Sequence, residues 1–225
     1  MQKEAWYFKE DNVKTYESYY EGKYKRADIL EKALLQKLLN TLSNPKSLLE
    51  VGCGTAHFTR WFESLDLECY GLDLSLLMLK EAKKLWSNES LLRGESAHLP
   101  FKDDSFDVVA FIACMEYMPN PVEVLAEASR VARKGIIIGL MNRWSLPTIR
   151  RIIQVKMKRN PYYKNAKFYS ILGIKRKLKD ALGDAYKVPY WSTTVFPKIL
   201  GNTESSLIPL GALLGVAVKL NELNN

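Results

Sequence analysis

One short segment, residues 47–58 (SLLEVGCGTAHF), constrains the fold of this 225-residue chain more than any other. Its apolar run at 48–51 predicts a strand that is buried on both faces. Gly52 and Gly54 then allow a turn so tight that a ligand can approach the backbone, and helical spacing follows. A strand, a glycine turn and a helix are typical of the start of a doubly wound α/β sheet, whose ligands bind at the carboxyl ends of the strands.

The glycine spacing separates two classes of cofactor. A dinucleotide turn needs a third glycine at position 57, which is His57 here. The observed pattern, E-x-G-x-G-x, instead places Glu50 beside the turn, and a carboxylate suits a cationic ligand better than a polyphosphate. S-adenosylmethionine carries a sulfonium and an ammonium and no phosphate. The stretch LLEVGCGTAHFT resembles the first motif of the class I S-adenosylmethionine-dependent methyltransferases, with Ala56 where many members have a third glycine.

A second motif follows the strand predicted at 68–73 (ECYGLD). This strand ends at Asp73, whose carboxylate can accept both ribose hydroxyls of a nucleoside. The continuation DLSLLMLKEAK resembles the family's second motif, which implies that Ser75 caps the next helix and that Met78 faces the adenine.

A third motif, GESAHLPF, resembles the family's G-D-A-x-x-L-P-F. The resemblance implies that Glu95 approaches the adenine amino group and that Ser96 and Ala97 offer backbone groups to the ring edge. Together these motifs imply S-adenosylmethionine as the cofactor, with S-adenosylhomocysteine as its product. The cofactor-binding residues so implied are Glu50, Gly52, Cys53, Gly54, Asp73, Leu74, Met78, Glu95, Ser96, Ala97 and Ile112.

The rest of the chain completes an α/β fold. With the resemblance, which implies an antiparallel hairpin of the last two strands at the sheet edge, we expect a doubly wound, mostly parallel seven-stranded sheet with helices on both faces and a small helical cap. Further strands are expected at 90–93, 108–112, 135–141, 186–196 and 211–220, and helices at 27–42, 121–132, 146–160 and 168–182. We expect a single methyltransferase domain over 1–225, made of an N-terminal helical cap (1–45), a cofactor-binding core (46–145), a basic helical cap segment (146–182) and C-terminal strands (183–225).

Composition limits the setting of the protein. The three cysteines form no C-x-x-C pair, and their odd number favours a reducing, cytoplasmic setting. The first residues lack the apolar core of a signal peptide, and no apolar span is long enough to cross a membrane. We therefore expect a soluble, cytoplasmic protein with no transmembrane segment. No cluster of His, Cys and Asp indicates a metal site. The net charge of +8 is regional, because residues 128–179 hold fifteen Lys or Arg and no acidic residue. That window includes the basic amphipathic helix from residue 146, which could pack on the sheet, cover the acceptor site or touch an anionic surface.

The acceptor end is less determined by the sequence. Glu116 and Tyr19 are the candidate catalytic bases, needed only if the acceptor must lose a proton. Candidate substrate-binding residues are Tyr16, Tyr20, Asn142 and Arg143. We expect metal-independent, in-line methyl transfer to a small-molecule acceptor, with an anionic acceptor as one option.

Two other functions stay open. An RNA methyltransferase would use the basic window at 128–179 and bind in a strongly salt-dependent way. A non-catalytic cofactor-binding module would keep the fold and lack turnover.

Overall fold

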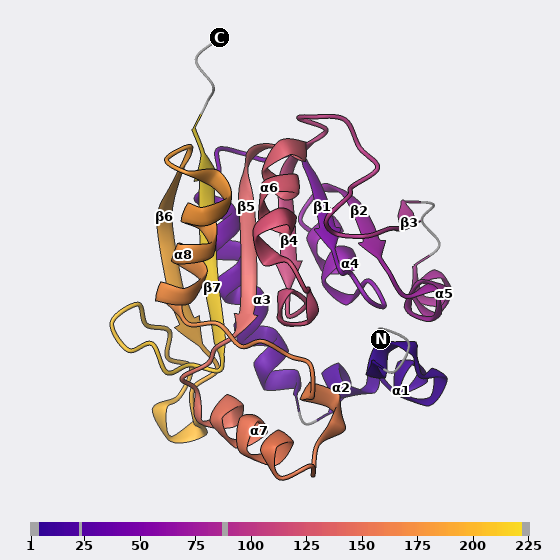
Figure 1. Cartoon of the computed structure of the whole chain (residues 1–225), viewed down its shortest axis with the longest axis vertical. Coiled ribbons are helices and arrows are strands. Elements are labelled where there is room, and N and C mark those ends of the chain that lie inside the picture. Colours follow the sequence, from indigo (N-terminus) through magenta and orange to yellow (C-terminus); the bar gives the residue numbers. More distant parts are fainter. Residues whose placement is uncertain (1–4, 23, 87–89, 222–225) are drawn as a thin grey trace.

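The computed structural model describes residues 5–22, 24–86 and 90–221. These residues form a seven-stranded sheet in the order β3-β2-β1-β4-β5-β7-β6 (Figure 1). Only β7 runs antiparallel to its neighbours β5 and β6, which confirms the doubly wound, mostly parallel fold with an antiparallel edge hairpin. The strands are β1 (Ser47–Val51), β2 (Glu68–Asp73), β3 (Leu91–Arg93), β4 (Phe106–Ile112), β5 (Ala132–Met141), β6 (Tyr186–Thr194) and β7 (Leu213–Leu220).

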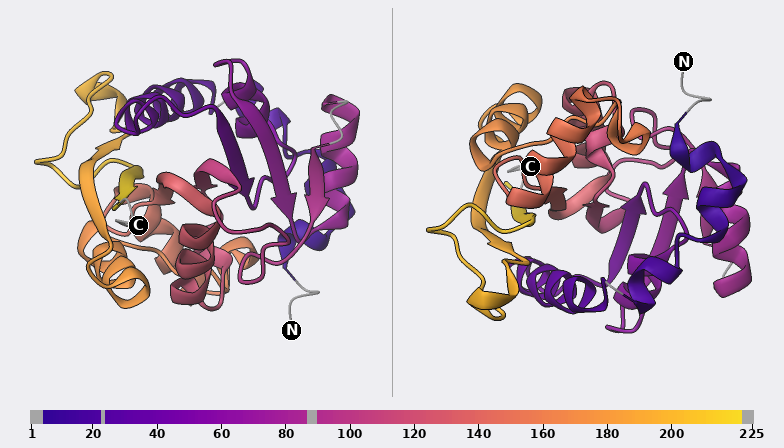
Figure 2. Two further views of the ribbon diagram at one scale, coloured as in Figure 1. Left: turned by 90° about the horizontal axis from the view of Figure 1, so that it is seen from above. Right: turned by 90° about the horizontal axis from the view of Figure 1, so that it is seen from below.

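The central strands are apolar because helices cover both of their faces. Every residue of β1 and β4 is buried. Helices α3 (Lys25–Asn40), α4 (His57–Glu63) and α5 (Leu76–Leu85) bury their apolar sides in one cluster, and α6 (Pro121–Val131) and α8 (Ile171–Leu182) do so in the other. Figure 2 shows α3 and α6 on opposite sides of the sheet.

Smaller elements lie at the carboxyl ends of the parallel strands. The N-terminal segment forms η2 (Trp6–Phe8), α1 (Glu10–Lys14) and α2 (Ser18–Glu21), and η3 (Met115–Tyr117) follows β4. Helix α7 (Leu146–Lys156), η4 (Pro161–Tyr163) and η5 (Lys198–Leu200) complete the set. Figure 1 shows α1, α2 and α7 together at this end of the molecule, which is where ligands of such sheets bind.

Several element boundaries differ from the expected ones. The helix expected at 168–182 begins at Ile171, because the Ser170 hydroxyl accepts a hydrogen bond from the Gly173 N–H and caps it. Strand β5 begins three residues early, at Ala132, directly after α6. The loop after β6 is held against the sheet by two backbone hydrogen bonds between Thr193 and Ser205. Within the described ranges, no helix is long and apolar enough to cross a bilayer.

Candidate active site

One cavity opens at the carboxyl ends of β1, β2 and β4. Its walls come from the glycine turn, the ends of these strands, the loop after β3 and the N-terminal segment. The sequence motifs therefore meet in space as expected. The cofactor-binding candidates that line this cavity are Glu50, Gly52, Cys53, Gly54, Asp73, Leu74, Met78, Glu95, Ser96 and Ile112.

The glycine turn has the backbone conformation that its sequence predicts. Gly52 and Gly54 have φ angles of +75° and +56°, which side chains other than glycine adopt with strain. The N–H groups of Gly52 and Cys53 both donate to the Leu72 carbonyl, at 2.7 and 3.1 Å, so β2 holds the turn in place. Ala56, where the sequence departs from the family motif, has a φ of +62°. This left-handed backbone angle explains why glycine suits that position.

Replacing Gly52 with alanine should lower the free energy of unfolding by more than the ~1–2 kcal/mol of left-handed backbone strain. The new Cβ would lie 2.7 Å from the Cys114 Cβ and 2.9 Å from its Sγ. Gly54→Ala is the matched control, because its φ is also positive while its Cβ would meet only the Met78 Sδ, at 4.0 Å. Urea denaturation of both variants measures the difference, and equal losses would contradict the predicted clash.

The Asp73 carboxylate is already tied to the backbone. Its Oδ2 accepts from the Gly54 N–H at 2.9 Å and its Oδ1 accepts from the Ser75 N–H at 2.7 Å. Burial raises the pKa of this carboxyl, and the backbone hydrogen bonds oppose that rise. An ionised carboxylate has about four acceptor positions, so each oxygen keeps room for a ribose hydroxyl. Asp73 therefore joins the glycine turn to the next helix and still faces the cavity.

Glu50 is the second carboxyl in the cavity wall. Its side chain is 1% exposed, and Oε2 accepts a hydrogen bond from the Thr59 hydroxyl at 2.5 Å. Burial is the main cause that raises the pKa of Glu50 to about 8, and the nearby Asp73 charge adds to it. A group in this state is neutral at pH 7 and becomes an anion readily when a cation is placed beside it.

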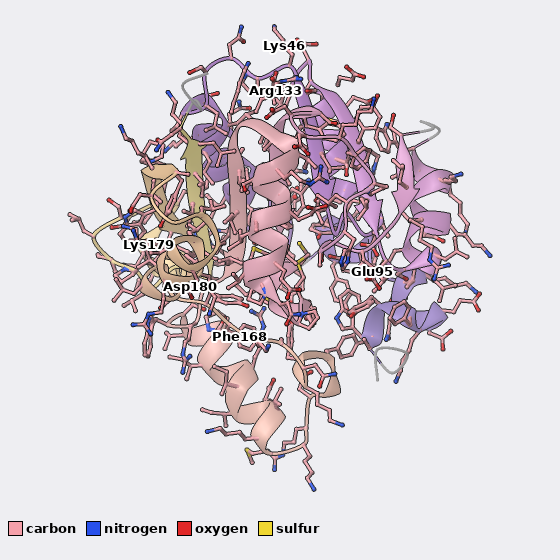
Figure 3. The ribbon with its side chains drawn as sticks, turned by 45° about the horizontal axis from the view of Figure 1, so that its top comes forward. Lys46, Glu95, Arg133, Phe168, Lys179 and Asp180 are labelled. Atoms are coloured by element: carbon pink, nitrogen blue, oxygen red, sulfur yellow. The ribbon has the colours of Figure 1, made fainter. Side chains whose placement is uncertain are left out.

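The expected adenine end lies toward the β3 edge of the sheet. Figure 3 labels Glu95 on this side of the molecule, away from Lys179 and Asp180 on α8. The Glu95 side chain is 66% exposed, so it is free to reach a ligand. Ala97 does not line the cavity, although its neighbour Ser96 does.

Aromatic rings from the N-terminal segment cover the other end of the cavity. Trp6 stacks on Tyr16 with ring centroids 5.5 Å apart, and it meets Tyr7 and Tyr117 edge to face. The Ser75 hydroxyl donates to the Tyr7 carbonyl at 2.6 Å and fixes this segment to the start of α5. Burial raises the pKa of Tyr16 to about 12, so its hydroxyl stays protonated near neutral pH.

His57, at the position where a dinucleotide turn would have its third glycine, also holds the N-terminal segment. Its ring stacks on Tyr20 with centroids 3.6 Å apart and an interplanar angle of 8°. Its Nε2 lies 2.7 Å from an Asp28 carboxylate oxygen, and the Tyr20 hydroxyl lies 3.1 Å from that of Tyr16. The His57 side chain, which a dinucleotide turn would not contain, therefore joins the start of α4 to the N-terminal tyrosines that cover the cavity.

The catalytic candidates lie outside the cavity lining. Tyr19 is 46% exposed and contacts the rings of Tyr16 and Tyr24. Glu116, in η3, is fully buried. Its Oε1 accepts from the Met141 N–H at 2.5 Å, while Oε2 has no partner among the described residues. Burial raises the pKa of Glu116 to about 7.

Two of the substrate-binding candidates also lie elsewhere, while Tyr16 and Tyr20 do line the cavity. Asn142 is buried, and its amide donates to the carbonyls of Pro209 and Gly211 at 2.8 Å each. Arg143 is exposed beside the Trp144 ring. Asn142 thus shapes a loop, and Arg143 faces solvent.

Some lining residues were not selected from the sequence. Trp6 and Tyr7 belong to an aromatic stretch whose tyrosines were noted, but no spacing rule says which ring faces inward. Cys114, Tyr117 and Met118 lie just past the fourth strand, at the carboxyl edge of the sheet, and His57 follows the glycine turn. The additional lining residues include Trp6, Tyr7, His57, Cys114, Tyr117 and Met118.

The fold and the site together define a doubly wound α/β protein with two carboxylates, Glu50 and Asp73, in a cavity at the carboxyl ends of its strands and an aromatic cover over that cavity. Residues 49–139 match the family described as methyltransferase domain. The chain belongs to the class I S-adenosylmethionine-dependent methyltransferases.

The chain is also similar to individual proteins. An uncharacterized protein of Methanocaldococcus jannaschii is 30% identical over 73% of this chain and 77% of its own length. A malonyl-[acyl-carrier protein] O-methyltransferase of Hamiltonella defensa is 30% identical over 60% of this chain, which spans about half (53%) of that relative. In structure, the chain resembles a possible histamine N-methyltransferase from Thermotoga maritima with a TM-score of 0.72 and 22% identity, covering 93% of this chain and 96% of that one. At that identity the likeness shows the fold alone.

Proposed function

We propose that this protein transfers a methyl group from S-adenosylmethionine to a small-molecule acceptor. The observation that carries the proposal is the single cavity in which the glycine turn, Glu50 and Asp73 face an aromatic enclosure. Glu50 and Asp73 suit the cationic methionine end and the ribose. The activated methyl group comes with the cofactor. The protein holds the acceptor in line with the S–CH₃ bond and excludes water, and such orientation contributes up to ~7–11 kcal/mol.

The cavity favours a neutral or cationic acceptor over an anionic one. Among the described residues, no Lys or Arg lines it, and its acceptor end is formed by Trp6, Tyr7, Tyr117 and Met118. The faces of aromatic rings attract cations and apolar groups, and the described lining holds no Lys or Arg that would balance an anionic acceptor. Arg143, the cationic substrate-binding candidate, is exposed and outside the lining.

Glu116 fits a positioning role better than that of a general base. Its carboxylate holds the Met141 N–H and so joins η3 to the end of β5 beside the acceptor end. The neutral hydroxyls of Tyr7, Tyr16 and Tyr117, whose pKa values burial raises, are donors and not bases near neutral pH.

The relatives' names support a small acceptor and leave its identity open. They include malonyl-[acyl-carrier protein] and tocopherol O-methyltransferases and two ajmaline-type N-methyltransferases. Incubating the purified chain with radiolabelled S-adenosylmethionine and fractionated metabolites, then identifying the labelled product, tests the proposal. Cofactor binding without transfer to any fraction would favour a non-catalytic module.

The cofactor prediction has a direct test. S-adenosylmethionine and S-adenosylhomocysteine should each raise the free energy of unfolding by about 2.7 kcal/mol at a hundredfold excess over Kd. NAD should have no effect, because the turn lacks the third glycine. Thermal shift measurements with the three ligands decide this, and no shift with either adenosyl ligand at millimolar concentration would overturn the assignment.

An RNA acceptor remains the second candidate because of the fifteen cations at 128–179. Binding to a nucleic-acid backbone would make the logarithm of affinity fall steeply with the logarithm of salt concentration. Filter binding of cellular RNA across a salt series separates it from the small-molecule proposal.

A further inference from the structure

No residue of helix α7 (Leu146–Lys156) lines the cavity, and the helix has a surface of its own. Of its 11 residues only Thr148 is buried. Figure 1 shows the helix at the end of the molecule that carries the cavity, apart from the helices that cover the sheet. The expected packing of this helix against the sheet is therefore slight, and most of its side chains face solvent.

One apolar stripe of α7 faces solvent, while Ile152 and Val155 are partly buried on the side of Thr148. Four apolar residues form a stripe along the helix: Leu146, Ile149, Ile153 and, just past the helix end, Met157. Leu146 is 70% exposed, and the other three are 39–51% exposed. At 3.6 residues per turn these four positions fall within a sector of about 80° that lies opposite Thr148. In a helix that packs on a protein core this relation is reversed. Nothing among the described residues covers the stripe.

Cations border the stripe on both sides. Arg150 and Lys156 are exposed at its two edges, and Lys158 and Arg159 follow the helix. The sequence has no acidic residue between Glu127 and Asp180 to balance them. An apolar stripe between rows of cations is complementary to a surface that offers anionic groups above an apolar layer.

Exposed apolar residues continue beside the start of α7. Trp144 in the preceding turn is 52% exposed. The Asn142 amide holds the neighbouring loop through the Pro209 and Gly211 carbonyls, and within that loop Leu207 is 90% exposed. The exposed patch is thus wider than the helix alone.

We propose that α7 is a membrane-binding helix that lies on the surface of an anionic lipid bilayer. The stripe Leu146, Ile149, Ile153 and Met157 would enter the headgroup region, and the bordering cations would contact lipid phosphates. A nucleic-acid backbone would use the cations but leave the outward isoleucines without a partner. The proposal concerns this surface alone and does not depend on the identity of the methyl acceptor.

Binding in this orientation would bring the bilayer close to the cavity cover. Residue Tyr162, in η4 just after α7, donates from its hydroxyl to the Asn12 side chain at 2.7 Å, and its ring lies 6.1 Å from that of Trp6. Figure 3 labels Phe168 toward this end, with Lys46 and Arg133 at the opposite end.

The test is co-sedimentation of the full chain with two kinds of vesicle, phosphatidylcholine alone and phosphatidylcholine mixed with phosphatidylglycerol. Wild-type protein should bind the mixed vesicles and bind the neutral ones weakly. Ile149→Ser with Ile153→Ser should reduce binding roughly tenfold or more, because two side chains lose burial in the lipid. Arg150→Glu should reduce it by about fivefold or more per charge removed, and added salt should have a similar effect.

Matched controls lie on α5, where Leu85 is 45% exposed and Lys83 is also exposed. Lys83→Glu with Leu85→Ser should leave vesicle binding unchanged. All the substituted side chains are exposed, so the thermal shift with S-adenosylmethionine should stay at the wild-type value and report intact folding separately from the lipid surface. Three results would each overturn the proposal: no binding to anionic vesicles at low salt, equal losses in the α5 control, or a stripe-dependent dimer in sedimentation velocity without vesicle binding.

Discussion

Replacing Asp73 with alanine should weaken S-adenosylmethionine binding by ~1.5–3 kcal/mol, the range for a hydrogen bond to a charged group. The structure adds a second reason for the loss, because both carboxylate oxygens also hold backbone N–H groups, those of Gly54 and Ser75. Removal of the carboxylate would free the glycine turn as well as the ribose site. Isothermal titration calorimetry measures the change as roughly ten- to 150-fold in Kd.

Two further variants separate these contributions. Asp73→Asn keeps one oxygen acceptor and loses the charge, so its loss should be smaller than that of the alanine variant. Glu68→Ala, at the opposite end of the same strand, is the control and should bind like the parent, because Glu68 is exposed and outside the cavity. If the Asp73→Ala variant also binds like the parent, the ribose role of Asp73 is wrong.

Affinity for S-adenosylmethionine should rise with pH up to about 8 because of Glu50. Burial raises the pKa of Glu50 to about 8, so the free protein holds a neutral carboxyl at lower pH. A cationic ligand favours the ionised form, and Kd should therefore fall by up to about tenfold for each pH unit below that pKa. The ligand's own ammonium also titrates, so the decisive measurement is the difference between wild type and Glu50→Gln across the same pH series.

The same shift predicts a change in stability without ligand. The pKa of Glu50 is higher in the folded state than its ordinary value of 4.5, so the folded protein binds more protons than the unfolded chain between these two values. The free energy of unfolding should fall as pH rises through this window and level off above it. Glu50→Gln should remove that part of the slope. A variant with the parent's pH dependence in both binding and stability would show that Glu50 does not titrate as described.

The sequence by itself determined the sheet and the cofactor end of the site. Buried strands leave continuous apolar runs, and β2 was predicted with its observed ends, Glu68 and Asp73. Because β1 and β2 are parallel neighbours, their carboxyl ends must meet, and the Gly54 N–H does lie 2.9 Å from an Asp73 oxygen. Local spacing was sufficient there, since each motif sits on a single turn next to its strand.

Only the tertiary structure decided which side chains cover the cavity. The tyrosine-rich N-terminal segment has no periodicity that distinguishes inward from outward rings. Tyr7 faces the cavity because its carbonyl accepts a hydrogen bond from Ser75, which is distant in the sequence. Trp6 faces the cavity because its ring stacks on that of Tyr16. Tyr19, selected on the same composition, points outward.

Burial at the ends of β4 and β5 was likewise decided by long-range contacts. Glu116 and Asn142 both follow apolar strands, where a polar side chain can face a ligand or satisfy the backbone. Each bonds to main-chain groups far along the chain, Glu116 to Met141 and Asn142 to Pro209 and Gly211.

The period of α7 predicts an apolar stripe, but a helical period does not state what covers that stripe. That depends on whether another element reaches it, and in the described chain none does, so Leu146, Ile149, Ile153 and Met157 stay exposed.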